Sequence, residues 1–108
     1  MTGRHEPTEV FSALADPTRR AVIRLLSNEG PATLGELAAQ LPVTRQAVAK
    51  HLVQLEHAGL VASAGSTRAR TYRLTPAPLT EAMGWMVDIG AEWDDRLERL
   101  KRQVERNS

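Results

Sequence analysis

The stretch TLGELAAQLPVTRQAVAKHLVQLEHAG, residues 33–59, is the most informative part of the chain, because two helix signatures follow each other closely in it. Thr33 and Glu36 form a capping box, in which a hydroxyl and a carboxylate each satisfy a free backbone N–H at a helix start. Apolar residues follow at the spacing of a short amphipathic helix: Leu34, Leu37, Ala38 and Leu41. Pro42 ends this first helix.

A second helix begins at once, because Thr44 is a favourable N-cap. It runs to about Ala58 and stops at Gly59, which suits a left-handed helix end. One face of it is apolar and is expected in the core: Val48, Leu52 and Leu55. Two short helices joined by a tight turn predict a helix-turn-helix over residues 33–58.

The opposite face of the second helix carries chemistry suited to DNA. Beside Val53 it holds three polar residues, Gln46, Lys50 and His57. The first turn, Arg45–Ala47, is the part that meets base edges in helix-turn-helix proteins. Arg pairs bidentately with guanine and Gln with adenine. Each residue alone fits an ordinary solvent-facing position equally well, but the combination favours DNA recognition.

The flanking segments complete a recognisable order of elements. Upstream, two helices are expected over residues 7–15 and 17–28, the second capped by Asp16. Downstream, the apolar period changes from 3.6 to 2, which predicts strands over residues 60–63 and 70–74 around a polar hairpin tip. A long helix is expected over residues 78–106.

These elements predict one domain over residues 1–108, mainly α with a β-hairpin wing, which is a winged helix-turn-helix with a long C-terminal dimerisation helix. The wing is expected over residues 60–74, and residues 1–6 as a mobile tail.

Charge is unevenly distributed although the net charge is only +1. Residues 33–75 contain five basic and two acidic side chains, whereas residues 76–108 contain five basic and seven acidic ones. Arg68 and Arg70 lie at the hairpin tip, where they can reach a phosphate backbone or a minor groove. Thr33, the capped helix start at Thr44, and Arg19 or Arg20 are further candidates for phosphate contact. The alternative for the wing is a charged hairpin that discourages edge aggregation.

Several classes of function find little support. The chain has no cysteine, no apolar run long enough for a membrane span and no apolar leader, so a cytoplasmic location is expected. There is no Ser/His/Asp set, no glycine-rich phosphate loop and no sign of paired carboxylates, so no enzymatic activity and no cofactor are expected.

The sequence resembles the ArsR-type winged-helix regulators. FSALADPTRR (residues 11–20) is similar to the opening motif of that family, TRQAVAKHL (44–52) to its reading helix, and HAGLV (57–61) with RTYRL (70–74) to its wing region. The resemblance covers about residues 8–106. It implies a homodimeric repressor on a palindromic operator, often that of its own operon. It also implies DNA contacts by residues of the reading helix and wing: Thr44, Arg45, Gln46, Lys50, His51, Arg68 and Arg70.

The family's metal-sensing patterns are missing from this sequence. Those sites use cysteines, or Asp and His pairs on the last helix, where Gly90 here follows Asp88 at the position of the expected His. His51 and His57 point about 120° apart on one helix, and His5 lies in the expected tail. Zinc needs three or four converging ligands, so no metal site is expected.

The last helix carries a heptad seam. Its apolar positions are spaced 4, 3, 4, 3, 4 from Met86 through Gly90, Trp93, Leu97 and Leu100 to Val104, and Leu79 and Met83 extend them. The family resemblance places the dimer interface in the first and last helices, which adds Phe11. An intramolecular core helix is the alternative. The region of Trp85 and Trp93 is a candidate site for an apolar ligand, such as an unidentified small-molecule effector.

Three hypotheses therefore remain: a DNA-binding autorepressor, a metal- or small-molecule-responsive repressor of the same fold, and a winged-helix module that binds another protein.

Overall fold

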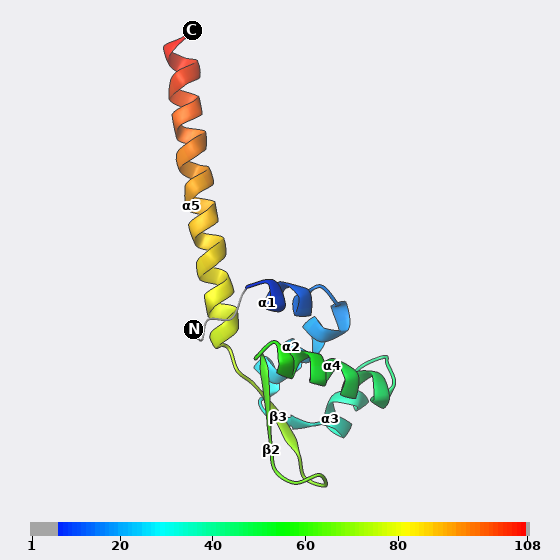
Figure 1. Ribbon diagram of the computed structural model, residues 1–108. Helices are drawn as coiled ribbons and strands as arrows, with labels where there is room; N and C mark the ends of the chain where they lie inside the picture. Colours follow the sequence, from blue (N-terminus) through cyan, green and yellow to red (C-terminus); the bar gives the residue numbers. More distant parts are fainter. Residues whose placement is uncertain (1–6, 108) are drawn as a thin grey trace.

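The computed structural model describes residues 7–107, so the expected tail at residues 1–6 lies outside the described part. Within the described part, five helices and three strands follow one another in the order α1 (Pro7–Leu14), α2 (Pro17–Glu29), β1 (Ala32–Thr33), α3 (Leu34–Ala39), α4 (Arg45–His57), β2 (Val61–Ala64), β3 (Thr71–Leu74) and α5 (Ala77–Arg106). The predicted winged helix-turn-helix fold is confirmed (Figure 1).

Local capping explains where the helices begin. The Asp16 carboxylate accepts the Arg19 N–H at 3.0 Å at the start of α2. The capping box of α3 is present in full, since the Thr33 N–H donates to Glu36 at 2.8 Å and the Glu36 N–H donates to the Thr33 hydroxyl at 3.1 Å. The Thr44 hydroxyl accepts the Ala47 N–H at 3.1 Å and starts α4.

The sheet differs from the predicted two-stranded hairpin by one additional strand. β1 pairs antiparallel with β3, with Ala32 opposite Tyr72, so the strand order is β1-β3-β2. Both strands of the predicted hairpin also begin one residue later than predicted, β2 at Val61 and β3 at Thr71. The Leu60 N–H donates to the Leu55 carbonyl at 3.0 Å, so Leu60 belongs to the turn that closes α4 and Val61 is the first residue of β2.

The core lies between α1, α2, α3, α4 and the base of the sheet. Its fully buried large side chains come from all of these helices and from the residue before β2: Val10, Val22, Leu37, Val48, Leu52, Leu55 and Leu60. The predicted inward face of α4 is thereby confirmed. Because this core holds both helices of the helix-turn-helix, α4 is presented as a rigid unit.

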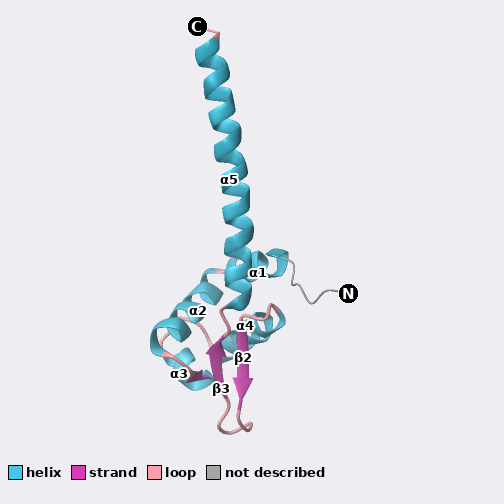
Figure 2. Cartoon of the chain, turned by 90° about the vertical axis from the view of Figure 1, so that its left-hand side faces the viewer, coloured by secondary structure: helices cyan, strands magenta, loops and turns pink. Residues whose placement is uncertain are grey.

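α5 begins on the body of the protein and extends far beyond it (Figure 1). Its first turns pack on α1, where Pro78 and Ala82 are buried and the Phe11 and Trp85 rings meet edge to face with centroids 5.6 Å apart. The rest of the helix projects away on the side opposite the wing, which gives the molecule a length of 70 Å (Figure 2). Within residues 7–107, no helix is both long enough and apolar enough to cross a membrane.

Candidate nucleic-acid interface

The first turn of α4 is open to solvent on the face away from the core. Arg45, Gln46 and Lys50 are exposed, and Ala47 is half-buried between them and the body. The capping bond of Thr44 orders the backbone of this turn. Since Val48 and Leu52 anchor the opposite side at 0% and 1% exposure, the polar face has little freedom to rotate.

A groove of about 400 Å³ connects this turn with the wing. It is lined by the start of α3, by Arg45 and by the wing: Thr33, Leu34, Gly35, Arg45, Thr67, Arg68, Arg70 and Tyr72. The groove thus collects three guanidinium groups from segments more than 20 residues apart in the chain. Among residues 7–107 none of the three groups has a hydrogen-bond or ion-pair partner, so the groove is prepared for an anionic ligand.

The Arg45 guanidinium lies close to Gly35 in this groove. A Cβ at position 35 would lie 3.7 Å from Nη1 and 3.8 Å from Nη2 of Arg45, which is ordinary van der Waals contact. The Arg45 guanidinium therefore lies against the first turn of α3.

The wing tip is a tight turn that depends on Gly65. This residue has a φ of 98°, and a Cβ on it would approach the Ala69 carbonyl oxygen to 2.4 Å. The Ala69 N–H in turn donates to the Ser66 carbonyl at 3.1 Å and lies 3.2 Å from the Ser66 hydroxyl. The turn holds the wing arginines at its end, on the groove side.

His51 and Arg19, which the sequence offered as DNA contacts, have partners within the chain. His51 is half-buried, with its Nε2 at 3.8 Å from Asp16 and its Nδ1 at 3.4 Å from Arg19. Arg19 donates to the carbonyls of Ser12 and Ala13 and to the Gln54 side chain. Both side chains are thus part of the contact between α1, α2 and α4, and sequence reasoning missed this role because the partners are distant along the chain.

Two carboxylates of the scaffold have pKa values below their ordinary ones. The Thr33 N–H that donates to Glu36 holds the pKa of Glu36 below its ordinary value. The Arg19 backbone N–H does the same for the pKa of Asp16, and the charges of His51 and Arg19 add to the effect. Both carboxylates therefore act as helix caps at neutral pH.

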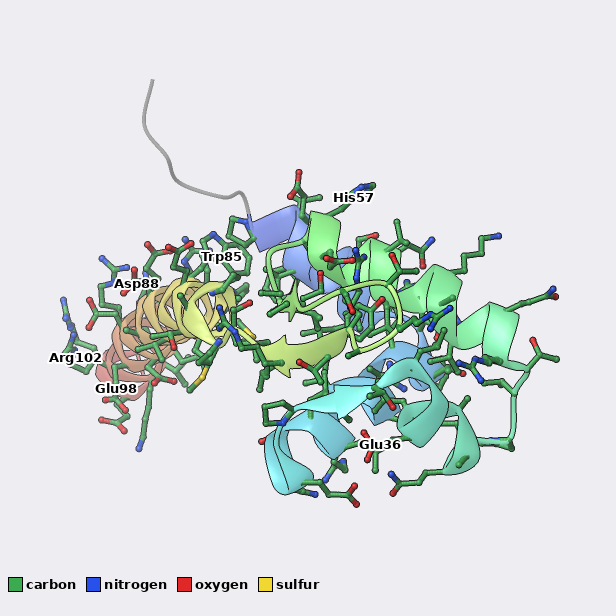
Figure 3. The ribbon with its side chains drawn as sticks, turned by 90° about the horizontal axis from the view of Figure 1, so that it is seen from below. Glu36, His57, Trp85, Asp88, Glu98 and Arg102 are labelled. Carbon is green, nitrogen blue, oxygen red and sulfur yellow. The ribbon has the colours of Figure 1, made fainter. Side chains whose placement is uncertain are left out.

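The residues expected at a dimer interface fall into two groups. Phe11 and Leu79 are half-buried, packed against the core of their own chain. The other expected interface residues are exposed. The exposed fractions of their side chains are 59% for Met83, 47% for Met86, 54% for Trp93, 55% for Leu97 and 56% for Leu100, and Gly90 between them is exposed as well. Figure 3 shows Trp85 on the side of α5 toward α1.

No group of three His, Asp or Glu side chains converges among residues 7–107 in a way that could hold a metal ion. The possible ligands Asp88 and His57, labelled in Figure 3, lie on different elements and well apart.

Known proteins resemble this chain along most of its length. Residues 14–64 match the family described as a helix-turn-helix domain. The HTH-type transcriptional regulator Rv2034 of Mycobacterium tuberculosis is 43% identical over 79 residues, which cover 73% of each chain. The transcriptional repressor SdpR of Bacillus subtilis is 28% identical over 82% of this chain and 97% of its own.

A solved structure agrees with the sequence relatives. The ArsR-like transcriptional regulator from Rhodococcus sp. RHA1 has a TM-score of 0.83 and 41% identity, covering 91% of this chain and 89% of its own. Both the sequence motifs and the fold thus point to regulators of transcription rather than to enzymes. The chain belongs to the ArsR family of winged helix-turn-helix transcriptional regulators, which bind double-stranded DNA.

Proposed function

We propose that the protein represses transcription in the cytoplasm as a symmetric homodimer on a palindromic operator, including that of its own operon. The observation that carries the proposal is the groove in which Arg45, Arg68 and Arg70 gather without a partner among the described residues. A positively charged groove between reading helix and wing matches the border of a major groove, where base edges lie beside the phosphate backbone.

Within this surface the residues have different tasks. Arg45 and Gln46 read base edges, with Ala47 allowing close approach of the helix. Lys50, Arg68, Arg70 and the helix starts at Thr33 and Thr44 bind phosphates or the adjoining minor groove. For His51, whose side chain faces Asp16 and Arg19, direct contact with DNA stays a prediction.

The exposed side of α5 supports a homodimer. Four large apolar side chains beyond the body are about half exposed or more: Trp93, Leu97, Leu100 and Val104. They lie beside the face that packs against α1 at the start of α5, which carries Pro78, Ala82 and Trp85. A second copy of the same stripe would cover them, as in a coiled coil.

The spacing of the stripe is compatible with an antiparallel pair. The apolar positions Leu79, Met83, Met86, Gly90, Trp93, Leu97, Leu100 and Val104 are spaced 4, 3, 4, 3, 4, 3, 4, which reads the same in both directions. Its centre lies between Ala91 and Glu92, which is also the middle of α5. In an antiparallel pair Gly90 then faces Trp93 of the partner subunit, a small residue opposite a large one.

The distribution of charge along α5 favours an antiparallel pair. Residues 77–95 hold five acidic and no basic side chains, whereas residues 96–106 hold five basic and two acidic ones. Antiparallel pairing places unlike halves together. Parallel pairing would set Arg96 against Lys101 of the partner subunit at the flanking heptad positions, where like charges repel. Such a symmetric dimer can present two reading helices to successive major grooves, about 34 Å apart.

The test of the dimer uses the glycines of α5. A Cβ at Gly90 or at Gly84 meets nothing within 4 Å in one chain and both positions are exposed, so we expect either substitution by Leu to leave the protomer folded. Gly84 lies on the side of the helix away from the seam. Gly90→Leu is expected to weaken self-association in sedimentation equilibrium by about tenfold or more, because overpacking costs about 1–3 kcal/mol at each of two sites. Gly84→Leu should leave it unchanged, and a monomeric wild type would contradict the dimer.

The test of the operator uses DNA from upstream of the protein's own gene. Footprinting is expected to show a two-fold symmetric protected site, and a reporter on that promoter should be repressed. Absence of protection on this DNA would contradict autoregulation. Release of the protein from DNA by added metal ions or small molecules would instead favour an effector-responsive repressor. A partner that is bound with only a shallow salt dependence and without preference for palindromes would favour a protein-binding module.

A further inference from the structure

Arg19 is the side chain that bridges α1 to the reading helix. Its Nε donates to the Ala13 carbonyl at 2.7 Å and its Nη2 to the Ser12 carbonyl at 3.0 Å, at the end of α1. Its Nη1 donates to the Gln54 side chain and lies 3.4 Å from His51 Nδ1, both on α4. One planar guanidinium thus occupies acceptors on two helices.

The two helices have little else in common at this point. α1 packs on α2 and α5, while α4 packs on α2, α3 and β2. Between α1 and α4 lies a groove of about 400 Å³, lined on one side by Thr8, Glu9, Ser12 and Ala13 and on the other by Gln54, His57 and Ala58, with Arg19 across it. Figure 3 shows His57 at the end of α4 beside α1.

α1 in turn is attached to α5. The edge-to-face contact of Phe11 with Trp85 joins them, and Ala82 of α5 is buried at 2% exposure. A continuous chain of contacts therefore runs from α5 through α1 and Arg19 to α4. The element proposed to pair the subunits is linked by this chain to the element proposed to read DNA.

We infer that Arg19 is a positioning residue that sets the orientation of α4 relative to the dimer axis, and thereby the spacing of the two half-sites that the repressor accepts. The inference rests on the proposed homodimer. It replaces the expectation that Arg19 binds a phosphate, because its donors already serve the carbonyls of Ser12 and Ala13 and the Gln54 side chain. A rigid link makes a wrongly spaced operator costly, since either protein or DNA must deform.

Lysine at position 19 keeps the charge but cannot reach acceptors on both helices with one fork of donors. Arg20 offers a matched control, because it donates to the Leu14 carbonyl at 2.6 Å at the same end of α1 and has no bond to α4. Gln54→Ala removes the α4 side of the link and leaves Arg19 in place, so it serves as the second variant where Arg19→Lys fails to fold.

The experiment measures binding to a series of palindromes in which the half-sites are moved apart or together by one and two base pairs. The wild type should prefer one spacing clearly. Arg19→Lys and Gln54→Ala should reduce that preference by about threefold to tenfold, the effect of one or two lost hydrogen bonds, with little change in Tm. Arg20→Lys should keep the wild-type profile.

A profile that is unchanged in a folded Arg19→Lys or Gln54→Ala protein would overturn the inference. So would a loss of affinity that is equal at every spacing and on non-specific DNA, which would indicate that the variant weakens DNA binding as a whole without changing the preferred half-site spacing.

A second measurement needs neither DNA nor the dimer. Because the natural chain has no cysteine, spin labels can be attached through Val53→Cys on α4 and Asp88→Cys on α5, in protein diluted with unlabelled chain. Arg19→Lys should broaden the distance distribution between the labels, and Arg20→Lys should not. An unchanged distribution would refute the link. A monomeric wild type would refute only the proposed dimer, and this measurement would still decide the role of Arg19.

Discussion

The contribution of the wing to DNA binding can be measured through the salt dependence of a single variant, Arg68→Ala. The Arg68 guanidinium lines the groove beside Arg45 and Arg70 and has no partner among residues 7–107. If each Arg68 of a dimer neutralises one phosphate, losing both reduces the slope of log K against log salt by about 1.8, because each phosphate contact contributes about 0.9.

This slope change has a large consequence in practice. Between 50 and 200 mM salt, a fourfold increase, the wild type should lose about 12-fold more affinity than Arg68→Ala. Fluorescence anisotropy with a labelled operator measures both slopes. Arg102→Ala is the matched control, since it removes the same charge from the exposed far part of α5, outside the groove (Figure 3). An Arg68→Ala slope equal to that of the wild type would refute a phosphate contact by the wing.

Three further predictions concern the scaffold of the interface. Leu52→Ala should lower the free energy of unfolding by about 2–5 kcal/mol in urea titrations, because Leu52 is 1% exposed beneath the reading face; a smaller loss would mean that the core collapses around the cavity. The pKa of Glu36 is lower in the folded chain than in the unfolded chain, so the folded chain binds fewer protons at acidic pH. The stabilisation that the Glu36 carboxylate contributes is therefore complete above the ordinary value of 4.5 and is lost as the pH falls below it. Glu36→Gln should therefore flatten the rise of Tm with pH in that acidic range, and an identical rise in both proteins would contradict the capping role. Gly65→Ala should distort the wing tip, since its Cβ would meet the Ala69 carbonyl oxygen at 2.4 Å; faster amide exchange confined to residues 61–74 with an unchanged Tm is expected, and wild-type exchange rates there would speak against the strain.

Helix positions were predictable because their signals are local. Asp16, Thr33 and Thr44 each accept a backbone N–H three residues ahead, and such bonds form within one turn of chain whatever lies around them. The predicted starts at Pro17 and Arg45 are confirmed for this reason. The predicted ends of α2 and α4 each differ by one residue from the observed ends at Glu29 and His57, because the last turn of a helix depends on the following loop.

Strand β1 and the use of Arg19 could not be predicted in the same way. Ala32 and Thr33 are too short a run to show a period, and they form a strand only because β3 lies beside them. Arg19 stood in a sequence motif that resembled the family, but its partners on α4, His51 and Gln54, lie 32 and 35 residues away. Long-range partners of this kind leave no trace in local spacing.

The amino-acid sequence alone specified the helix-turn-helix, the wing, the polar face of the reading helix and the apolar stripe of the last helix, because capping and amphipathic periodicity act over a few residues. Tertiary structure alone decided that Arg45 meets the wing arginines in one groove, and that His51 and Arg19 turn inward to join three helices. The reason is that side chains distant in the chain come together only when the shared core fixes the elements that carry them.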